Sequence, residues 1–79
     1  MQAINSAQIR AARAMLKITA QELADAAGVG VATVRRAESD DGGSPTRVVN
    51  QAIRVALEAA GIEFIPENGG GAGVRLRKV

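Results

Sequence analysis

Residues 19–38 limit the fold of this chain more than any other segment does. Thr19 and Glu22 stand three positions apart, which is the spacing of a capping box at the start of a helix. Gly28 then supplies a residue that tolerates the left-handed conformation in which many helices end. The chain turns again at Gly30 and resumes a helical pattern. The segment therefore predicts two short helices joined by a tight turn.

Each of the two predicted helices has an apolar inner face. Apolar residues recur at helical spacing: Leu23, Ala24 and Ala27 on the first helix, Val34 and Ala37 on the second. The second helix presents its other residues outward: Val31, Ala32, Thr33, Arg35 and Arg36. Adjacent helical residues point about 100° apart, so the two arginines are expected to reach different partners. A plainer alternative is that they pair along the helix end, for example Arg35 with Ser39 or Asp40.

Two further helices are expected to flank this pair. The first opens at Asn5, where Gln8 completes a second capping box, and extends to about Lys17. The last is expected over residues 45–60, with Ser44 as its cap and a proline in its first position. Their apolar faces are Ile9, Ala12 and Leu16 on the first, and Val49, Ala52, Ile53, Ala56, Leu57 and Ala60 on the last.

The C-terminal residues change to the two-residue period of strands. Apolar and charged residues alternate on either side of a glycine-rich stretch: Ile62, Phe64, Val74 and Leu76 against Glu63, Arg75 and Arg77. We therefore expect a helical domain over residues 1–61 and a β-hairpin over residues 62–79. A lone hairpin is only marginally stable, so it should pack on the last helix or pair with a second copy. Pairing across a two-fold axis is favoured, with the four apolar strand residues as the dimerisation element.

Composition limits the size of the core and the charge available for partners. A chain of 79 residues forms one domain at most, and a domain of this size buries only about 60% of its unfolded surface. Its 16 alanines and single phenylalanine favour closely approaching helices around a thin core. The net charge is only +2, so attraction to nucleic acid depends on where the basic residues cluster.

Several classes of protein are excluded by what the sequence lacks. Without histidine or cysteine, the usual zinc sites, thiol nucleophiles and histidine bases cannot form, so we expect no metal, no cofactor and no enzymatic activity. The glycine-rich residues 69–73 lack the lysine and hydroxyl of a phosphate loop. No apolar run approaches the roughly 18 residues that span a bilayer, and no signal peptide pattern is present. A cytoplasmic protein without membrane contact is expected.

A set of residues along the helical part resembles one known family. They are Arg13, Leu23, Ala24, Gly28, Val29, Thr33, Val34, Arg36 and Glu38, in order and without a gap. Together they resemble the Cro and phage-repressor type of helix-turn-helix regulators, also called the xenobiotic-response-element family, over roughly residues 6–61. The resemblance implies a mainly α, four-helix, lambda-repressor-like domain, here with a C-terminal β-hairpin, that binds double-stranded DNA.

The resemblance also implies roles for individual residues. The DNA-binding residues are expected to be Gln21, Gly30, Val31, Ala32, Thr33, Arg35, Arg36 and Arg47. Arg36 occupies a position that reads a base or grips the backbone, and its strongest use is a bidentate contact with guanine. In the family, an ion pair at the positions of Arg13 and Glu38 ties the first helix to the end of the recognition helix. The recognition helix is the second helix of the motif, whose start points into the major groove.

Two features depart from the family pattern. A serine or threonine is common at position 30, but Gly30 can neither cap the helix nor bond phosphate with a side chain. Direct readout is therefore expected to be sparse, with operator shape carrying much of the specificity. Asp40 and Asp41 follow the recognition helix. They would weaken DNA binding if they faced phosphates, but could also point away or limit non-specific affinity.

These expectations favour a dimeric, sequence-specific DNA-binding protein that represses transcription, including that of its own operon, from a pseudo-palindromic operator. Two alternatives remain open. The same fold could activate transcription by touching RNA polymerase, or it could serve as an antitoxin that binds a partner toxin and represses their shared operon. In the second case the hairpin edge would be the element that binds the partner.

Overall fold

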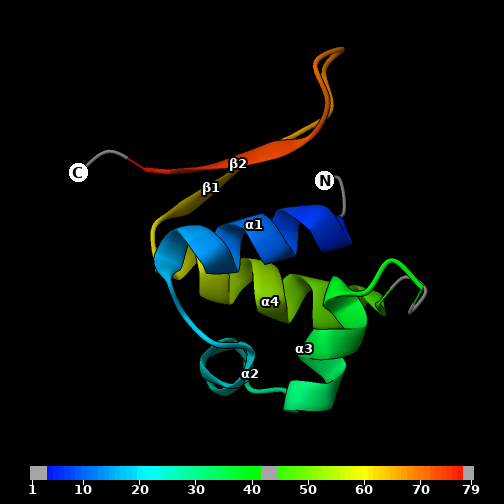
Figure 1. Cartoon of the computed structure of the whole chain (residues 1–79), viewed down its shortest axis with the longest axis vertical. Coiled ribbons are helices and arrows are strands. Elements are labelled where there is room, and N and C mark those ends of the chain that lie inside the picture. The colour runs from blue at the N-terminus through cyan, green and yellow to red at the C-terminus, as the bar shows by residue number, and fades with distance from the viewer. Residues whose placement is uncertain (1–3, 42–44, 78–79) are drawn as a thin grey trace.

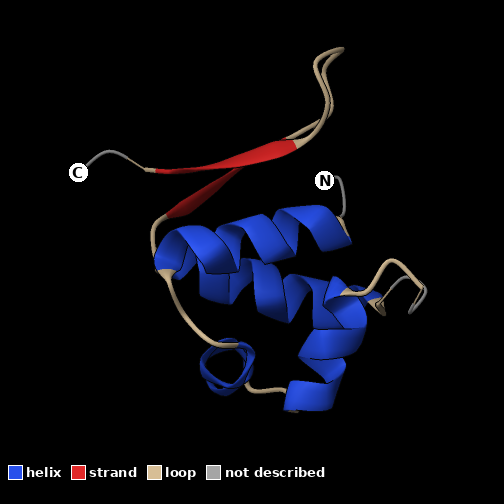
Figure 2. Cartoon of the chain, in the orientation of Figure 1, coloured by secondary structure: helices blue, strands red, loops and turns tan. Residues whose placement is uncertain are grey.

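The computed structural model describes residues 4–41 and 45–77 (Figure 1). The described residues form six elements: α1 (Ser6–Leu16), α2 (Ala20–Ala27), α3 (Val31–Glu38), α4 (Arg47–Ala59), β1 (Ile62–Ile65) and β2 (Gly73–Leu76). Figure 2 shows the helices gathered in one body, with the two strands lying along one side of it. The expected architecture, four helices followed by an antiparallel hairpin, is confirmed.

Both predicted capping boxes are formed. At the start of α1, Asn5 Oδ1 accepts a hydrogen bond from Gln8 N at 2.8 Å, and Asn5 N donates to Gln8 Oε1 at 2.9 Å. At the start of α2, Thr19 Oγ1 accepts from Glu22 N at 3.0 Å, and Thr19 N donates to Glu22 Oε1 at 2.8 Å. Each box satisfies two N–H groups that a helix start would otherwise leave without a partner, so both helices begin where the sequence indicates.

The start of α4 differs from the prediction. The expected cap, Ser44, lies outside the described residues, and Pro45 precedes the helix instead of beginning it. Thr46 is the N-cap, with its Oγ1 accepting from Val49 N at 3.2 Å. A threonine hydroxyl that captures this amide is a favourable way to open a helix. The helix consequently begins at Arg47, which places that arginine in its exposed first turn.

The core is small and aliphatic, and every helix contributes to it. Its largest fully buried side chains are Ile9, Leu23, Val34, Ile53, Leu57 and Ile62. Ala12 and Ala24 are also fully buried, and their small side chains allow the helices around them to approach closely. Val34 and Ala37 fix α3 in this same core. One face of α3 is therefore immobilised, and its opposite face is left to solvent.

One buried polar residue was not anticipated. Asn50 of α4 accepts a hydrogen bond from Ile4 N at 3.3 Å and donates Nδ2 to Ile4 O at 3.0 Å. Ile4 itself is buried, so without Asn50 both of its backbone groups would lose their partner inside the protein. The asparagine thus ties the segment before α1 to α4.

The hairpin packs on the helical body. The predicted hairpin is present, and its register pairs Ile62 with Leu76 and Phe64 with Val74. It lies against α1 and α4, on the side of the molecule opposite α2 and α3 (Figure 1). Gln8 of α1 joins both strands, because its Nε2 donates to the carbonyl oxygens of Gly73 at 3.0 Å and Ile65 at 3.4 Å. The helical body thus supports the hairpin that would be marginal alone.

Candidate nucleic-acid interface

The turn between α2 and α3 has the glycine-dependent geometry that the sequence predicted. Gly28 ends α2 at φ 71°, and Val29 N donates to Ala24 O at 3.0 Å. Gly30 then opens α3 in an extended conformation, with its carbonyl accepting from Thr33 N at 3.0 Å and Val34 N at 3.2 Å. No side chain caps this start. In Figure 1, α2 is seen end-on beside α3, so the two axes cross steeply.

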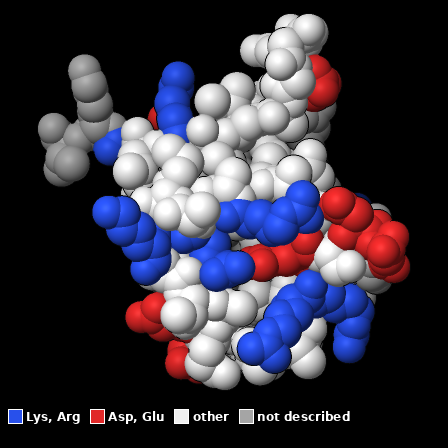
Figure 3. All heavy atoms as spheres, viewed as in Figure 1, with Lys and Arg blue, Asp and Glu red and all other residues white. Residues whose placement is uncertain are grey.

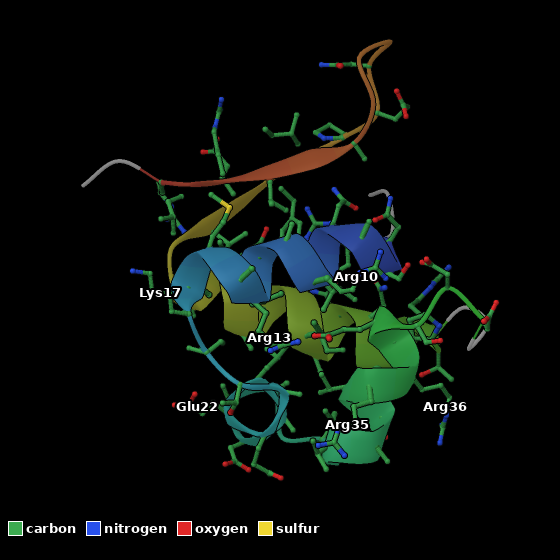
Figure 4. All side chains as sticks on the ribbon, in the orientation of Figure 1. Arg10, Arg13, Lys17, Glu22, Arg35 and Arg36 are labelled. Carbon is green, nitrogen blue, oxygen red and sulfur yellow. The ribbon has the colours of Figure 1, made fainter. Side chains whose placement is uncertain are left out.

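The outer face of α3 carries two exposed arginines. Neither Arg35 nor Arg36 makes a hydrogen bond or ion pair with another described residue, so the alternative pairing of Arg35 with Ser39 or Asp40 is not seen in this part of the chain. The two side chains leave α3 in different directions: Arg36 projects away from the body of the domain, and Arg35 lies on the side of α3 toward α2 (Figure 4). Within residues 4–41 and 45–77, nothing therefore occupies their guanidinium groups.

The other expected contact residues lie on three elements. Val31 and Thr33 are half-buried at the start of α3, whereas Ala32 is exposed. Gln21 lies in the first turn of α2, where its Nε2 donates to Asp25 Oδ1 at 2.9 Å. Arg47 is exposed at the start of α4.

Acidic groups border the arginines of α3. Figure 3 shows the basic side chains of this face with acidic side chains to both sides of them. Glu22 and Asp25 lie on α2, and Asp40 and Asp41 follow α3. Basic side chains of α1, among them Lys17, also lie on this face (Figure 4), so positive charge extends beyond α3 and is interrupted by the acidic groups.

Arg13 and Glu38 form an ion pair with two hydrogen bonds. Arg13 Nε lies 2.8 Å from Glu38 Oε2, and its Nη2 lies 3.1 Å from Oε1. A third donor, Nη1, reaches Ile18 O at 3.1 Å. Only 9% of Glu38 is exposed. The hydrogen bond to Glu38 raises the pKa of Arg13 above its usual value, although burial partly opposes this. In Figure 4, Arg13 points from α1 toward α3, and the pair joins these helices.

A second link between α1 and the end of α3 was not anticipated. Ser6 Oγ donates to Asp40 Oδ1 at 2.6 Å, and Arg10 Nη1 lies 3.2 Å from the same oxygen. Arg10 also donates to the backbone carbonyl of Glu38. The Ser6 hydrogen bond, and then that of Arg10, lower the pKa of Asp40 below its usual value. We call these three residues the Ser6–Arg10–Asp40 cluster. The spacing of Ser6 and Arg10 was visible in the sequence, but their distant partner was not.

Comparison with known proteins gives the family. A family model for helix-turn-helix proteins of the Cro/C1 type matches residues 9–49, just over half of the chain. The chain belongs to this helix-turn-helix family. The match covers most of α1, all of α2 and α3, and the start of α4. Members of the family are DNA-binding transcriptional regulators and not enzymes, and this chain is a DNA-binding regulator in that general sense. A search of curated proteins found no match.

The described part of this helix-turn-helix regulator has neither a cluster of metal ligands nor a membrane-spanning helix. Residues 4–41 and 45–77 contain no group of three potential metal ligands among acidic, histidine and cysteine side chains. In the same residues, no helix has the length and apolarity to cross a membrane.

The hairpin residues expected at a dimer interface differ in how far they are exposed. Ile62 is 1% exposed, because it belongs to the core of the regulator itself. Phe64 and Val74 are half-buried against the same core. Leu76 is 48% exposed and is the one of the four with a largely open side chain. A dimer formed here would therefore use backbone edges and Leu76, and its existence stays a prediction.

Proposed function

We propose that this regulator is a dimeric repressor that reads a pseudo-palindromic operator with α3. The observation that carries the proposal is the state of Arg35 and Arg36, which are exposed and unpaired among the described residues on a helix whose opposite face is fixed in the core. An arginine that has no internal partner loses no ion pair when it binds DNA. Because the two point in different directions, one can contact a base edge while the other contacts a phosphate.

Arg36 is the residue that we assign to base readout, through a bidentate contact with guanine in the major groove. The start of α3 offers little else for hydrogen bonding to bases. Gly30 has no side chain, and Val31 and Ala32 provide only apolar contact, for example to a thymine methyl group. Operator shape and flexibility would then supply much of the remaining specificity, while Gln21, Thr33 and Arg47 contact the backbone.

The hairpin supports the dimer in this proposal. Both strands of a two-stranded sheet are edge strands, and their unpaired backbone groups can accept a strand from a second copy. The hairpin lies opposite α2 and α3, so pairing there leaves α3 uncovered. In a symmetric dimer, the two recognition helices would lie about 34–36 Å apart, one turn of DNA. A dimer bound at the promoter would block access to that DNA, so transcription of the regulator's own operon would fall.

The proposal is tested by footprinting the purified protein on the DNA upstream of its own gene, with excess random competitor at two salt concentrations. A protected pseudo-palindrome that resists competitor is the expected result. Inserting about five base pairs between the half-sites moves them to opposite faces of the duplex and should abolish cooperative binding. Binding that is lost to competitor at both salt concentrations would contradict autorepression, and binding that is indifferent to the insertion would contradict the symmetric dimer.

A further inference from the structure

Three polar residues of α1 lie on the face that meets the end of α3. Ser6, Arg10 and Arg13 are spaced four and three residues apart, so their side chains leave the same side of the helix. Arg13 binds the Glu38 side chain, and the other two bind Asp40. In Figure 4, Arg10 and Arg13 both reach from α1 toward α3. One face of α1 thus binds both Glu38, the last residue of α3, and Asp40 in the loop that follows it.

The contacts of Arg10 suit the chemistry of a helix end. It donates to the carbonyl of Glu38, one of the last carbonyls of α3, which have no acceptor role within the helix. A positive charge at this end is also favoured by the helix dipole. Asp40, which is 73% exposed, holds this guanidinium in place and neutralises its charge. Arg10 therefore has intramolecular partners, whereas Arg35 and Arg36 have none among the described residues.

We propose that the Ser6–Arg10–Asp40 cluster positions α3 for DNA, so that Asp40 strengthens DNA binding although it is acidic. The inference rests on the DNA-binding function proposed above. The core holds the inner face of this eight-residue helix, which has no side-chain cap at its start, and the cluster adds a further attachment at its C-terminal end. If releasing that end leaves only a fraction of the molecules with α3 in the binding position, the dissociation constant rises by the inverse of that fraction.

If Asp40 affected DNA only through its negative charge, removing it would have the opposite effect on affinity. A carboxylate that merely faced DNA phosphates would repel them, and its removal would tighten binding. Asp41 provides a matched control, because it adjoins Asp40 and carries the same charge. Its backbone N donates to Ser39 Oγ at 3.2 Å, but its carboxylate has no hydrogen bond or ion pair with another described residue. Asp40→Asn and Asp41→Asn therefore remove the same charge, and only the first removes contacts to α1.

The experiment measures dissociation constants for the protected upstream DNA over a range of salt concentrations. We expect Asp40→Asn to weaken binding by about 1.5- to 5-fold, the range for releasing an exposed, hydrogen-bonded ion pair. Asp41→Asn should leave the affinity unchanged or raise it. Arg10→Ala should weaken binding as Asp40→Asn does, with an unchanged salt slope. The proposal is overturned if Asp40→Asn tightens binding as Asp41→Asn does, or if Arg10→Ala lowers the slope by about one, as loss of a phosphate contact would.

Hydrogen exchange of the free protein separates this proposal from the function on which it rests. In Asp40→Asn, the amides of Ala37 and Glu38 should exchange several-fold faster than in the wild type, while that of Ile53 in α4 changes little. Unchanged exchange at the end of α3 would overturn the positioning role whatever the DNA result. A wild-type protein that binds no DNA specifically would overturn the proposed function and the effect of the cluster on affinity, even if exchange showed that the cluster holds the helix.

Discussion

Arg13 of α1 engages both carboxylate oxygens of Glu38, the last residue of α3, at 2.8 and 3.1 Å. Glu38 is almost fully buried, whereas 29% of the Arg13 side chain reaches solvent. The same arginine donates to Ile18 O, in the segment between α1 and α2. One side chain therefore connects the first helix to the end of α3 and to the segment that leads into α2.

Removal of this carboxylate should lower stability before it changes sequence preference. In Glu38→Ala, Arg13 keeps its charge in a partly buried site without its partner, so we expect the free energy of unfolding to fall by about 2–4 kcal/mol. Urea denaturation measures this. Asp25→Asn, which alters an exposed contact on α2, should cost less than about 1 kcal/mol. A Glu38→Ala protein of wild-type stability with an altered DNA preference would contradict the structural role.

Asn50 should be similarly important because of its two hydrogen bonds to Ile4. Asn50→Ala leaves a buried N–H and a buried carbonyl without partners, which we expect to cost about 1–3 kcal/mol in the free energy of unfolding. Its neighbour Gln51 is exposed on the same helix, and Gln51→Ala should change stability by less than about 0.5 kcal/mol. Equal effects of the two substitutions in thermal denaturation would show that the buried hydrogen bonds add little.

Gly30 is a site where a substitution should stabilise the protein. Its backbone is extended at φ −74° and ψ 151°, which any residue adopts, and an added Cβ would lie 3.9 Å from Thr33 Oγ1, an ordinary contact. Gly30→Ser adds a capping hydroxyl and reduces the freedom of the unfolded chain, so we expect a gain of about 0.5–1 kcal/mol in thermal or urea denaturation.

Gly28 provides the contrasting control for that substitution. It has φ 71°, a conformation that L side chains rarely adopt. Gly28→Ser should therefore destabilise the protein by about 1 kcal/mol or more. If serine had the same effect at both positions, the difference in backbone conformation would not be what governs stability in this turn.

Asp40 should make stability depend on pH in the acid range. Its pKa in the folded protein lies below the ordinary value of 3.8, because Ser6 and Arg10 bind its ionised form. The unfolded chain therefore takes up the proton first as pH falls, and the stabilisation is complete only above about pH 5, beyond the unfolded pKa. This stabilisation declines at lower pH and is lost once the pH falls through the pKa of Asp40 in the folded protein. Wild type and Asp40→Asn should differ in unfolding midpoint at pH 7, and this difference should shrink as the solution is acidified below the unfolded pKa. A difference that grows on acidification would contradict this linkage.

Local patterns predicted the parts of this fold that depend on residues close together in the chain. Asn5 with Gln8 and Thr19 with Glu22 form their capping boxes, because each box is complete within one turn of helix. The two strands of the hairpin followed from the alternation of apolar and charged residues. The predicted start of α4 is wrong: proline favours the first helical position, but the Thr46 hydroxyl supplies the cap and the helix begins after it.

Contacts between residues far apart in the chain could not be predicted from local sequence patterns. The links from Asp40 to Ser6 and from Asn50 to Ile4 join residues 34 and 46 positions apart, and neither has a periodic signal. The Arg13–Glu38 pair was expected only through the family resemblance. For the proposed DNA-binding face, the sequence indicated which residues of α3 point outward. Only the structure shows that Arg10 is paired with Asp40, whereas Arg35 and Arg36 have no partner among the described residues.

The central claim is that α3 reads DNA sequence through Arg36. The most direct measurement is the affinity of Arg36→Ala for the protected upstream DNA and for random DNA, beside Arg75→Ala. Arg75 is an exposed arginine paired with Glu63 on the hairpin, on the opposite side of the molecule. Loss of a bidentate base contact costs about 1–3 kcal/mol, so Arg36→Ala should weaken specific binding by about 5- to 150-fold and random-DNA binding much less. Arg75→Ala should have little effect on either. Equal losses for Arg36→Ala on specific and random DNA, or equal losses for the two variants, would contradict base readout by this arginine.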